Sequence, residues 1–201
     1  MKIFLIAFTG LLFVFATPAN AQVPPGTDEL AAYDGLFRAA ADGDVDTIKR
    51  LTAAGAKLNA RDGRNRTPLM VAAHQRQYDA ARALIAAGAT TTLVTSICDG
   101  TALIAAAHLG HDEVVRTLIH FDAPLDHIND LDWTALIEAI VLGDGGPRHV
   151  ATVGALVDAG ADLEDAVSGR SASRANAAIP RLLKYWRRQM PNPDALPGAY
   201  S

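Results

Sequence analysis

The sequence has little of two residue types that would otherwise define its class. It contains a single cysteine, Cys98, and only 6% of its 201 residues are aromatic. One cysteine excludes an internal disulfide framework. Because Phe, Tyr and Trp are scarce, Ala, Leu, Val and Ile must supply most of the core. That composition suits closely packed helices better than a β-sandwich.

The apolar run near the N-terminus, residues 3–16, is shorter than the roughly 20 residues that a membrane-spanning helix needs. Lys2 precedes it, and the segment TPANA that follows ends in the A-x-A pattern of a cleavage site. We therefore expect residues 1–21 to be a signal peptide that is cut after Ala21. The mature chain would then be periplasmic or secreted. The alternative is a retained membrane anchor.

A helix-turn-helix pattern recurs along the chain, and residues 99–126 (DGTALIAAAHLGHDEVVRTLIHFDAPLD) show it most completely. The first positions of the copies are 33, 34 and 33 residues apart. These positions are Asp34, Thr67, Thr101 and Thr134. A leucine always lies two residues further on, and an alanine five residues further on. Neither helix of one copy can form a core alone, so the copies must stack.

Each recurring residue type has a role in packing or capping. Alanine lets neighbouring helices approach to about 8 Å, and leucine fills the seam between copies. The threonines can cap the first helix by accepting a backbone hydrogen bond. Glycine can end the second helix in the left-handed conformation, at Gly55, Gly88 and Gly160. Asp122 replaces glycine in the third copy, and aspartate tolerates that conformation better than most residues.

The motifs TPLMVAAHQRQ, TALIAAAHLGH and TALIEAIVLGD resemble the T-P-L-H-x-A-A-x-x-G motif of ankyrin repeats. The resemblance covers residues 34–165 and implies an all-α solenoid of about four helix-turn-helix repeats. Residues 22–33 would be a linker and lead-in. The histidine of the motif is replaced by Met70, Ile104 and Ile137. The hydrogen bonds that this histidine usually makes must therefore be lost or replaced by packing.

The charge changes sign towards the C-terminus. Residues 22–165 carry 11 bases and 21 acids, a balance of 11 − 21 = −10, whereas residues 166–201 carry six bases and one acid, 6 − 1 = +5. We interpret residues 166–190 as a degenerate C-terminal capping helix, because an open stack end must be covered. Residues 191–201 are expected to be a disordered tail. In the alternative interpretation, the basic helix binds anionic lipid or an acidic partner.

In ankyrin stacks, the loop tips and the first helices line a concave binding face. The resemblance therefore implies partner contacts at exposed residues of those segments. They are Arg38, Arg64, Asn65, Arg66, His74, Gln75, Asp99, His108, Asp132 and Glu138. Further first-helix positions expected to be exposed are Ala41, Val71 and Ala105. The set lacks the clustered Lys and Arg of a nucleic-acid-binding stripe, so we expect the partner to be another protein. We also expect the chain to be a monomer. For any single position, the alternative is an ordinary solvated residue.

His74 and His108 occupy the same position in successive copies, which raises the question of a metal site. Adjacent repeats lie roughly 10 Å apart, whereas zinc–nitrogen bonds are about 2 Å long. No third ligand has suitable spacing, so we expect no metal and no cofactor. His111 lies in the turn between helices, where a structural hydrogen bond is the favoured interpretation.

The fourth copy carries five extra residues in the stretch around GDGGPRH, residues 143–149. A glycine-rich turn before a helix can cradle phosphate, and Arg148 and His149 would help. The Gly-Lys-Ser/Thr ending of a P-loop is absent, however. We favour an enlarged turn in which Pro147 starts the second helix. The loop remains an alternative partner contact.

Cys98 lies at a loop tip, where it can react, pair with another chain or fill space. Asp99 beside it disfavours a reactive thiolate. No Ser/His/Asp arrangement stands out, and we expect no enzymatic activity. A cleavable signal peptide followed by a short stack resembles exported ankyrin proteins of Gram-negative bacteria. The resemblance implies a scaffold or inhibitor of the cell envelope that binds through its concave face.

Overall fold

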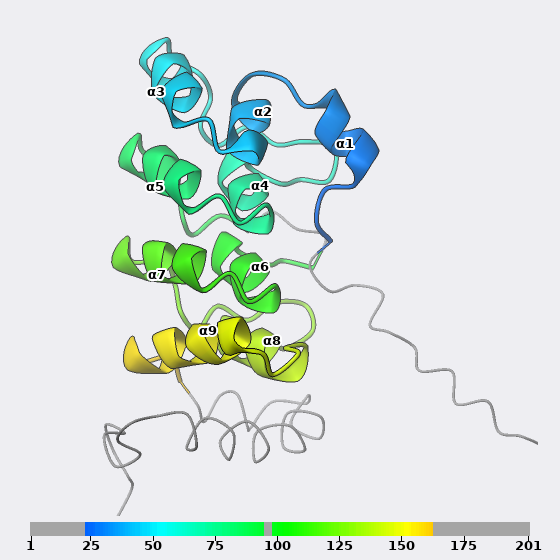
Figure 1. Cartoon of the computed structure of the whole chain (residues 1–201), viewed down its shortest axis with the longest axis vertical. Coiled ribbons are helices and arrows are strands. Elements are labelled where there is room, and N and C mark those ends of the chain that lie inside the picture. The colour runs from blue at the N-terminus through cyan, green and yellow to red at the C-terminus, as the bar shows by residue number, and fades with distance from the viewer. Residues whose placement is uncertain (1–22, 95–97, 163–201) are drawn as a thin grey trace, which may run out of the picture.

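The computed structural model describes residues 23–94 and 98–162 (Figure 1). The predicted signal peptide, C-terminal cap and tail lie outside these residues. Within them, all regular structure is helical. A short leading helix is followed by four helix-turn-helix pairs, each with a shorter first helix and a longer second one. The helices are α1 (Thr27–Ala32), α2 (Gly35–Asp42), α3 (Val45–Ala53), α4 (Pro68–His74), α5 (Tyr78–Ala86), α6 (Ala102–His108), α7 (Asp112–His120), α8 (Ala135–Val141) and α9 (Pro147–Asp158).

The four pairs stack in chain order as layers (Figure 1). The first helices α2, α4, α6 and α8 contact one another in sequence and form one row, and the second helices α3, α5, α7 and α9 form another. Each first helix also packs on the second helix of its own pair. The predicted all-α solenoid of four stacked repeats is therefore confirmed.

One apolar cluster runs through all four layers. The recurring leucines Leu69, Leu103 and Leu136 are at most 1% exposed. The recurring alanines of the same three copies are fully buried, at 0% exposure. Burying one leucine side chain stabilises the fold by about 1.5–3 kcal/mol. The stack is therefore held together mainly by these repeated seams.

The caps form as the sequence predicts. The hydroxyl oxygens of Thr67, Thr101 and Thr134 each accept the backbone N–H three residues further on, at 3.3 Å. At the other end of the second helix, Gly88 has φ 106° and Asp122 has φ 55°. Asp122 thus adopts the left-handed conformation of the glycine that it replaces.

The five extra residues of the fourth repeat are shared between helix and turn. Helix α9 has 12 residues against nine in α7, which accounts for three. The turn between α8 and α9 spans residues 142–146, two more than the three of residues 109–111. Pro147 is the first residue of α9, as predicted.

The predicted lead-in contains α1, a helix of six residues that buries none of them. It lies beside the loop that joins the first two repeats (Figure 1). Its attachment to the stack is polar and forms part of the site described below. Among residues 23–94 and 98–162, no helix combines the length and the apolar composition of a membrane span.

Candidate binding surface

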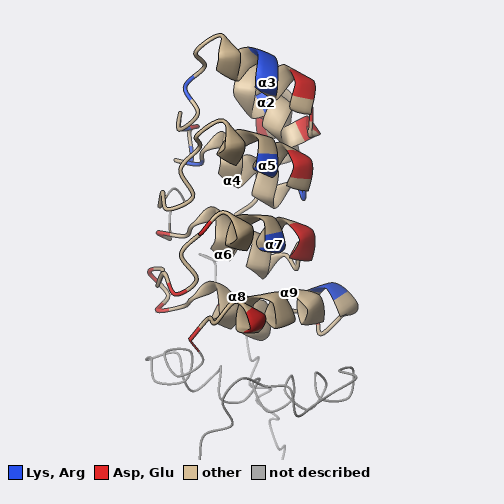
Figure 2. Cartoon of the chain, turned by 90° about the vertical axis from the view of Figure 1, so that its left-hand side faces the viewer, with Lys and Arg blue, Asp and Glu red and all other residues tan. Residues whose placement is uncertain are grey.

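The loops that join successive repeats lie along one side of the stack (Figure 2). We call this side the loop-tip edge; its described residues are 56–67, 89–94, 98–101 and 123–134. At the apex of each loop, an exposed residue has a positive φ: 64° at Asn65, 53° at Asp99 and 58° at Asp132. Each apex lies two residues before a threonine cap. Asn and Asp are the residues other than glycine that best tolerate this backbone conformation. All three are sequence-predicted contact residues, and the structure leaves them exposed.

The loop-tip edge is electrically polarised along the stack. At the first tip, Lys57, Arg61 and Arg64 are exposed. Beyond it, the exposed charged residues of the edge are all acidic: Asp99, Asp126, Asp130 and Asp132. Figure 2 shows Lys and Arg in the first loop and Asp in the loops below it. Residues 83–115 and 117–147 contain no Lys or Arg; the described basic residues of the third and fourth repeats are Arg116 and Arg148, which lie on the second helices α7 and α9.

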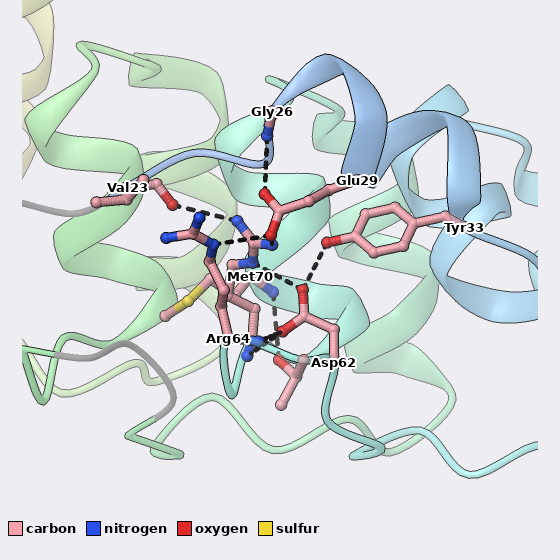
Figure 3. Close-up of polar contacts among 9 residues, drawn as sticks. Val23, Gly26, Glu29, Tyr33, Asp62, Arg64 and Met70 are labelled. Atoms are coloured by element: carbon pink, nitrogen blue, oxygen red, sulfur yellow. Dashed lines mark hydrogen bonds and ion pairs between the residues drawn. The ribbon is translucent and has the colours of Figure 1, made fainter.

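The first tip is held by a network that reaches back to α1 (Figure 3). Arg64 Nε and Arg66 Nη2 both contact Oε1 of Glu29, at 2.8 and 3.0 Å. Arg66 also donates from Nε to Asp62 at 2.8 Å and from Nη1 to the carbonyl of Val23 at 3.3 Å. Two arginines of the loop therefore converge on one carboxylate of the lead-in.

Asp62 organises this loop. Its carboxylate accepts hydrogen bonds from the backbone N–H groups of Arg64 and Arg66, from the Arg66 guanidinium and from the Tyr33 hydroxyl at 2.6 Å. Burial raises the pKa of Asp62, but the bonds from Tyr33 and the two arginines outweigh it and leave the pKa below its ordinary value. Burial of Tyr33 and its hydrogen bond to the Asp62 carboxylate raise the pKa of the Tyr33 hydroxyl. Asp62 is thus held as a carboxylate and fixes Arg66 in place.

The predicted exposure of Arg66 is wrong: the residue is 2% exposed. The lead-in covers it, and a pair of carboxylates, Asp62 and Glu29, neutralises it. Arg64 remains 47% exposed at the side chain. Glu29 and Tyr33 take part in this network but lie in the segment predicted as linker and lead-in. The sequence pattern therefore did not indicate that Arg66 is buried.

Glu138, also predicted to be exposed, is completely buried at 0%. His108 Nδ1 donates to its Oε2 at 2.8 Å, across the boundary between α6 and α8. Asn129 Nδ2 donates to Oε1 at 2.9 Å, while the Asn129 oxygen accepts the backbone N–H groups of Leu131 and Trp133. Glu138 therefore joins the third loop to two first helices. Its role in the folded chain is structural.

His74 is the third correction, since it is only 4% exposed. Neither of its ring nitrogens has a hydrogen-bond partner within the part of the chain that the structure describes. Burial first, and then the positive charge of Arg66, lower its pKa to about 3. His74 is therefore a neutral, buried imidazole at the end of α4 at ordinary pH.

The inner positions of the first helices are buried for a common reason. Ala41, Val71 and Ala105 are 8%, 0% and 0% exposed, although the repeat position predicted exposure. Helices α4 and α6 each pack between two neighbouring first helices and against their own second helix, while α2 and α8 each contact one neighbouring first helix, α4 and α6 respectively, and their own second helix. Only residues at the very end, such as the half-buried Gln75 and His108, approach solvent. Arg38 stays half-exposed and pairs with Asp42 at 2.6 Å.

A set of contacts between repeats was missed by the sequence. In each, a polar side chain at the start of a second helix bonds to a backbone carbonyl in the first helix of the repeat before it. The pairs are Gln77 to Ala41 at 3.2 Å, His111 to Ala73 at 2.8 Å and His149 to His108 at 3.1 Å. The structural hydrogen bond predicted for His111 is among them. The available signal was a polar residue at this position in three copies.

The phosphate-loop alternative for residues 143–149 is not favoured by the geometry. The Asp144 carboxylate accepts the backbone N–H of Gly146 at 2.8 Å, and its Oδ1 lies 2.7 Å from Nδ1 of His149. The Gly146 and His149 bonds together lower the pKa of Asp144. The turn thus supplies its own anion, and an incoming phosphate would meet a carboxylate.

Cys98 is 4% exposed, and burial together with the nearby Asp130 and Glu138 raises the pKa of its thiol. This environment favours a space-filling role over a reactive one. Within the described residues, no three His, Cys, Asp or Glu side chains come together as a metal site requires.

Two family models of ankyrin repeats match the chain, one of many copies over residues 36–85 and one of three copies over residues 88–166. The chain belongs to the ankyrin-repeat family. Ankyrin repeats generally mediate protein–protein interaction and are non-enzymatic binding modules, and no enzymatic family is indicated.

The chain is similar to the ankyrin repeat protein YahD of Escherichia coli (strain K12). The two are 30% identical over 156 residues, which cover 61% of this chain and 78% of YahD. It is also similar to the ankyrin repeat and KH domain-containing protein mask-1 of Caenorhabditis elegans. That match is 35% identical over 170 residues and covers 80% of this chain but 6% of mask-1.

Proposed function

We propose that this chain is a protein-binding module of the bacterial cell envelope, a scaffold or inhibitor that binds through the loop-tip edge of its concave face. The observation that carries the proposal is the polarised loop-tip edge. Its apex residues Asn65, Asp99 and Asp132 are exposed and belong to no apolar cluster of the described residues. A rigid stack that presents such loops is a common arrangement for recognition.

The charge pattern supports a partner with complementary polarity. Exposed Asp99, Asp126, Asp130 and Asp132 lie in the second and third loops, whose described residues include no Lys or Arg, and Ile128 among them is 50% exposed. Like charges that face each other across an interface cost several kcal/mol, whereas complementary charges raise the association rate. The acidic part of the loop-tip edge therefore fits a basic segment with an apolar side chain for Ile128.

Affinity capture with a charge-matched control tests the surface. The test variant is Asp99→Asn/Asp132→Asn, which keeps residues that tolerate the positive φ of the two apices, and the control is Asp46→Asn/Glu113→Gln on the exposed side of α3 and α7, which changes the net charge equally. A partner captured from envelope extract by the wild type and the control, but lost by the test variant, supports the proposal. Loss from both variants, or from neither, contradicts it.

The envelope location rests on residues 1–21, whose Lys2, apolar run and A-x-A ending match a secretory signal. Cell fractionation followed by N-terminal sequencing is the direct test. We expect periplasmic or secreted protein that begins at Gln22. Cytoplasmic protein that still begins at Met1 would contradict the location, while leaving the binding surface open to test with the purified chain.

A further inference from the structure

We propose that Arg64 and Arg66 form a carboxylate-binding site for an acidic peptide segment of a partner protein, and that Glu29 occupies this site in the free chain. The inference rests on the proposed binding function and names the chemistry of its first tip. In the free chain, the Glu29 carboxylate of α1 takes the place of the partner's carboxylate.

The geometry of the arginine pair carries the first step. Arg64 Nε and Arg66 Nη2 lie 2.8 and 3.0 Å from the same oxygen, Oε1 of Glu29. Hydrogen bonds between ionised groups are roughly twice as strong as those between neutral groups. Arg66 keeps its place without Glu29, because Asp62 accepts its Nε–H at 2.8 Å. The site is therefore built by the loop and is only filled by the lead-in.

The second step is the weak attachment of α1. The helix has six residues and buries none of them, and so short a helix has little stability of its own. Besides Glu29, the lead-in is held by the Tyr33 hydroxyl on Asp62, by Arg38 Nη1 on the Leu30 carbonyl and by the Val23 carbonyl on Arg66. The apolar contacts of the lead-in include the buried Pro25 and the Tyr33 ring, whose centroid lies 5.4 Å from that of Phe37. Exchanging Glu29 itself for an external carboxylate gives up only polar contacts, those to Arg64, Arg66 and the Gly26 N–H.

The third step is where an acidic segment can dock. Around the arginine pair, Lys57 and Arg61 are also exposed, so the first tip is cationic. The remaining tips carry exposed Asp99 and Asp132, which repel an acidic segment. The electrostatics of the edge thus direct such a segment to the first tip, where it competes with Glu29.

The test uses a decaglutamate peptide and the purified chain, residues 22–201. Glu29→Ala empties the site. We expect the Glu29→Ala chain to bind the peptide about tenfold more tightly than the wild-type chain does. Adding Arg64→Ala to Glu29→Ala should remove that gain. Binding should also vanish at about 1 M salt, where the Debye length falls to about 3 Å. Arg64 is chosen because its side chain is half-exposed, whereas replacing the buried Arg66 threatens the fold.

Matched controls are Glu113→Ala and Arg116→Ala, both exposed positions on α7 that should bind the peptide as the wild type does. Hydrogen exchange reports displacement: in the wild type, saturating peptide should raise exchange in residues 27–32. No tighter binding by Glu29→Ala, equal binding after Arg64→Ala, or unchanged exchange in α1 would each overturn the inference. Equal binding of an oligothymidylate of the same charge would also overturn it, because the site would then read charge alone.

This experiment is independent of the partner captured from cells. Peptide binding with no captured partner would leave the carboxylate site intact and count against the proposed function. A captured partner with no peptide binding would do the reverse.

Discussion

His108 on α6 donates a hydrogen bond from Nδ1 to the buried carboxylate of Glu138 on α8, at 2.8 Å and across a repeat boundary. His74 occupies the equivalent place one repeat earlier, but neither of its ring nitrogens has a hydrogen-bond partner, carboxylate or other, within the described residues. Two histidines at the same repeat position therefore differ: the His108 ring has a hydrogen-bond partner, whereas the His74 ring has none among the described residues. The contrast leads to opposite expectations for their replacement.

Replacing Glu138 should be strongly destabilising. Glu138→Ala leaves the side-chain donors of His108 and Asn129 without their acceptor in a buried place, and an unsatisfied buried group costs about 1–3 kcal/mol. We expect a loss of about 2–5 kcal/mol in the free energy of unfolding, measured by urea denaturation. Glu113→Ala on the exposed face of α7 is the control and should stay within about 0.5 kcal/mol. A loss as small as that control would contradict a structural role for Glu138.

Replacing His74 should be stabilising instead. Leucine fits a buried position of similar size and removes two polar nitrogens that gain no hydrogen bond from the described residues. We expect His74→Leu to raise the free energy of unfolding by about 1–3 kcal/mol. The corresponding change in the satisfied residue, His108→Leu, should lower it. If both changes act in the same direction, the distinction between the two histidines is wrong.

Stability should fall on acidification because of His74. Its pKa is about 3 in the folded chain, against an ordinary value of 6.5. Between these values the unfolded chain binds a proton that the folded chain does not, so stability falls as pH falls. The stabilising contribution is complete above about pH 6.5, and the slope is at most about 1.4 kcal/mol per pH unit.

Urea denaturation between pH 7 and pH 4 measures this slope. His74→Leu should flatten it, leaving a smaller slope of the same sign from His111, whose pKa burial also lowers. Replacement of the exposed His120 by asparagine is the control and should preserve the wild-type profile. An unchanged profile in His74→Leu would show that another group carries the acid sensitivity.

Gly110 is expected to be less replaceable than Gly55. Both have a positive φ, 63° and 84°, but a Cβ on Gly110 would lie 2.9 Å from the His149 ring, whereas one on Gly55 would meet nothing within 4 Å. We expect Gly110→Ala to cost about 2–4 kcal/mol and Gly55→Ala about 1–2. In a His149→Ala background the excess should disappear. If it persists, the ring contact is not its cause.

The architecture could be predicted because each repeat has the same capping and packing residues at the same local spacing. The spacing of Thr67, Thr101 and Thr134, with leucine and alanine at fixed distances, determines which faces pack, and each repeat contacts only its neighbours. The same periodicity led to the errors at His74 and Glu138. A repeat position indicates which way a side chain points, but not whether the neighbouring layer covers it.

The first tip could not be predicted, because it depends on contacts between residues far apart in the sequence. Arg66 is buried by Glu29 and Val23, which lie 37 and 43 residues earlier and follow no repeat. The apex residues Asn65, Asp99 and Asp132 were predictable, since they depend only on local turn geometry. Where a side chain's surroundings come from outside the repeat, the periodicity carries no information.

Hydrogen-exchange footprinting of the chain with its captured partner tests whether the loop-tip edge is the binding surface. We expect protection in residues 61–66, 98–101 and 123–134, with no change on the exposed face of α3, α5 and α7. Protection confined to those second helices, with the loop tips unchanged, would contradict it.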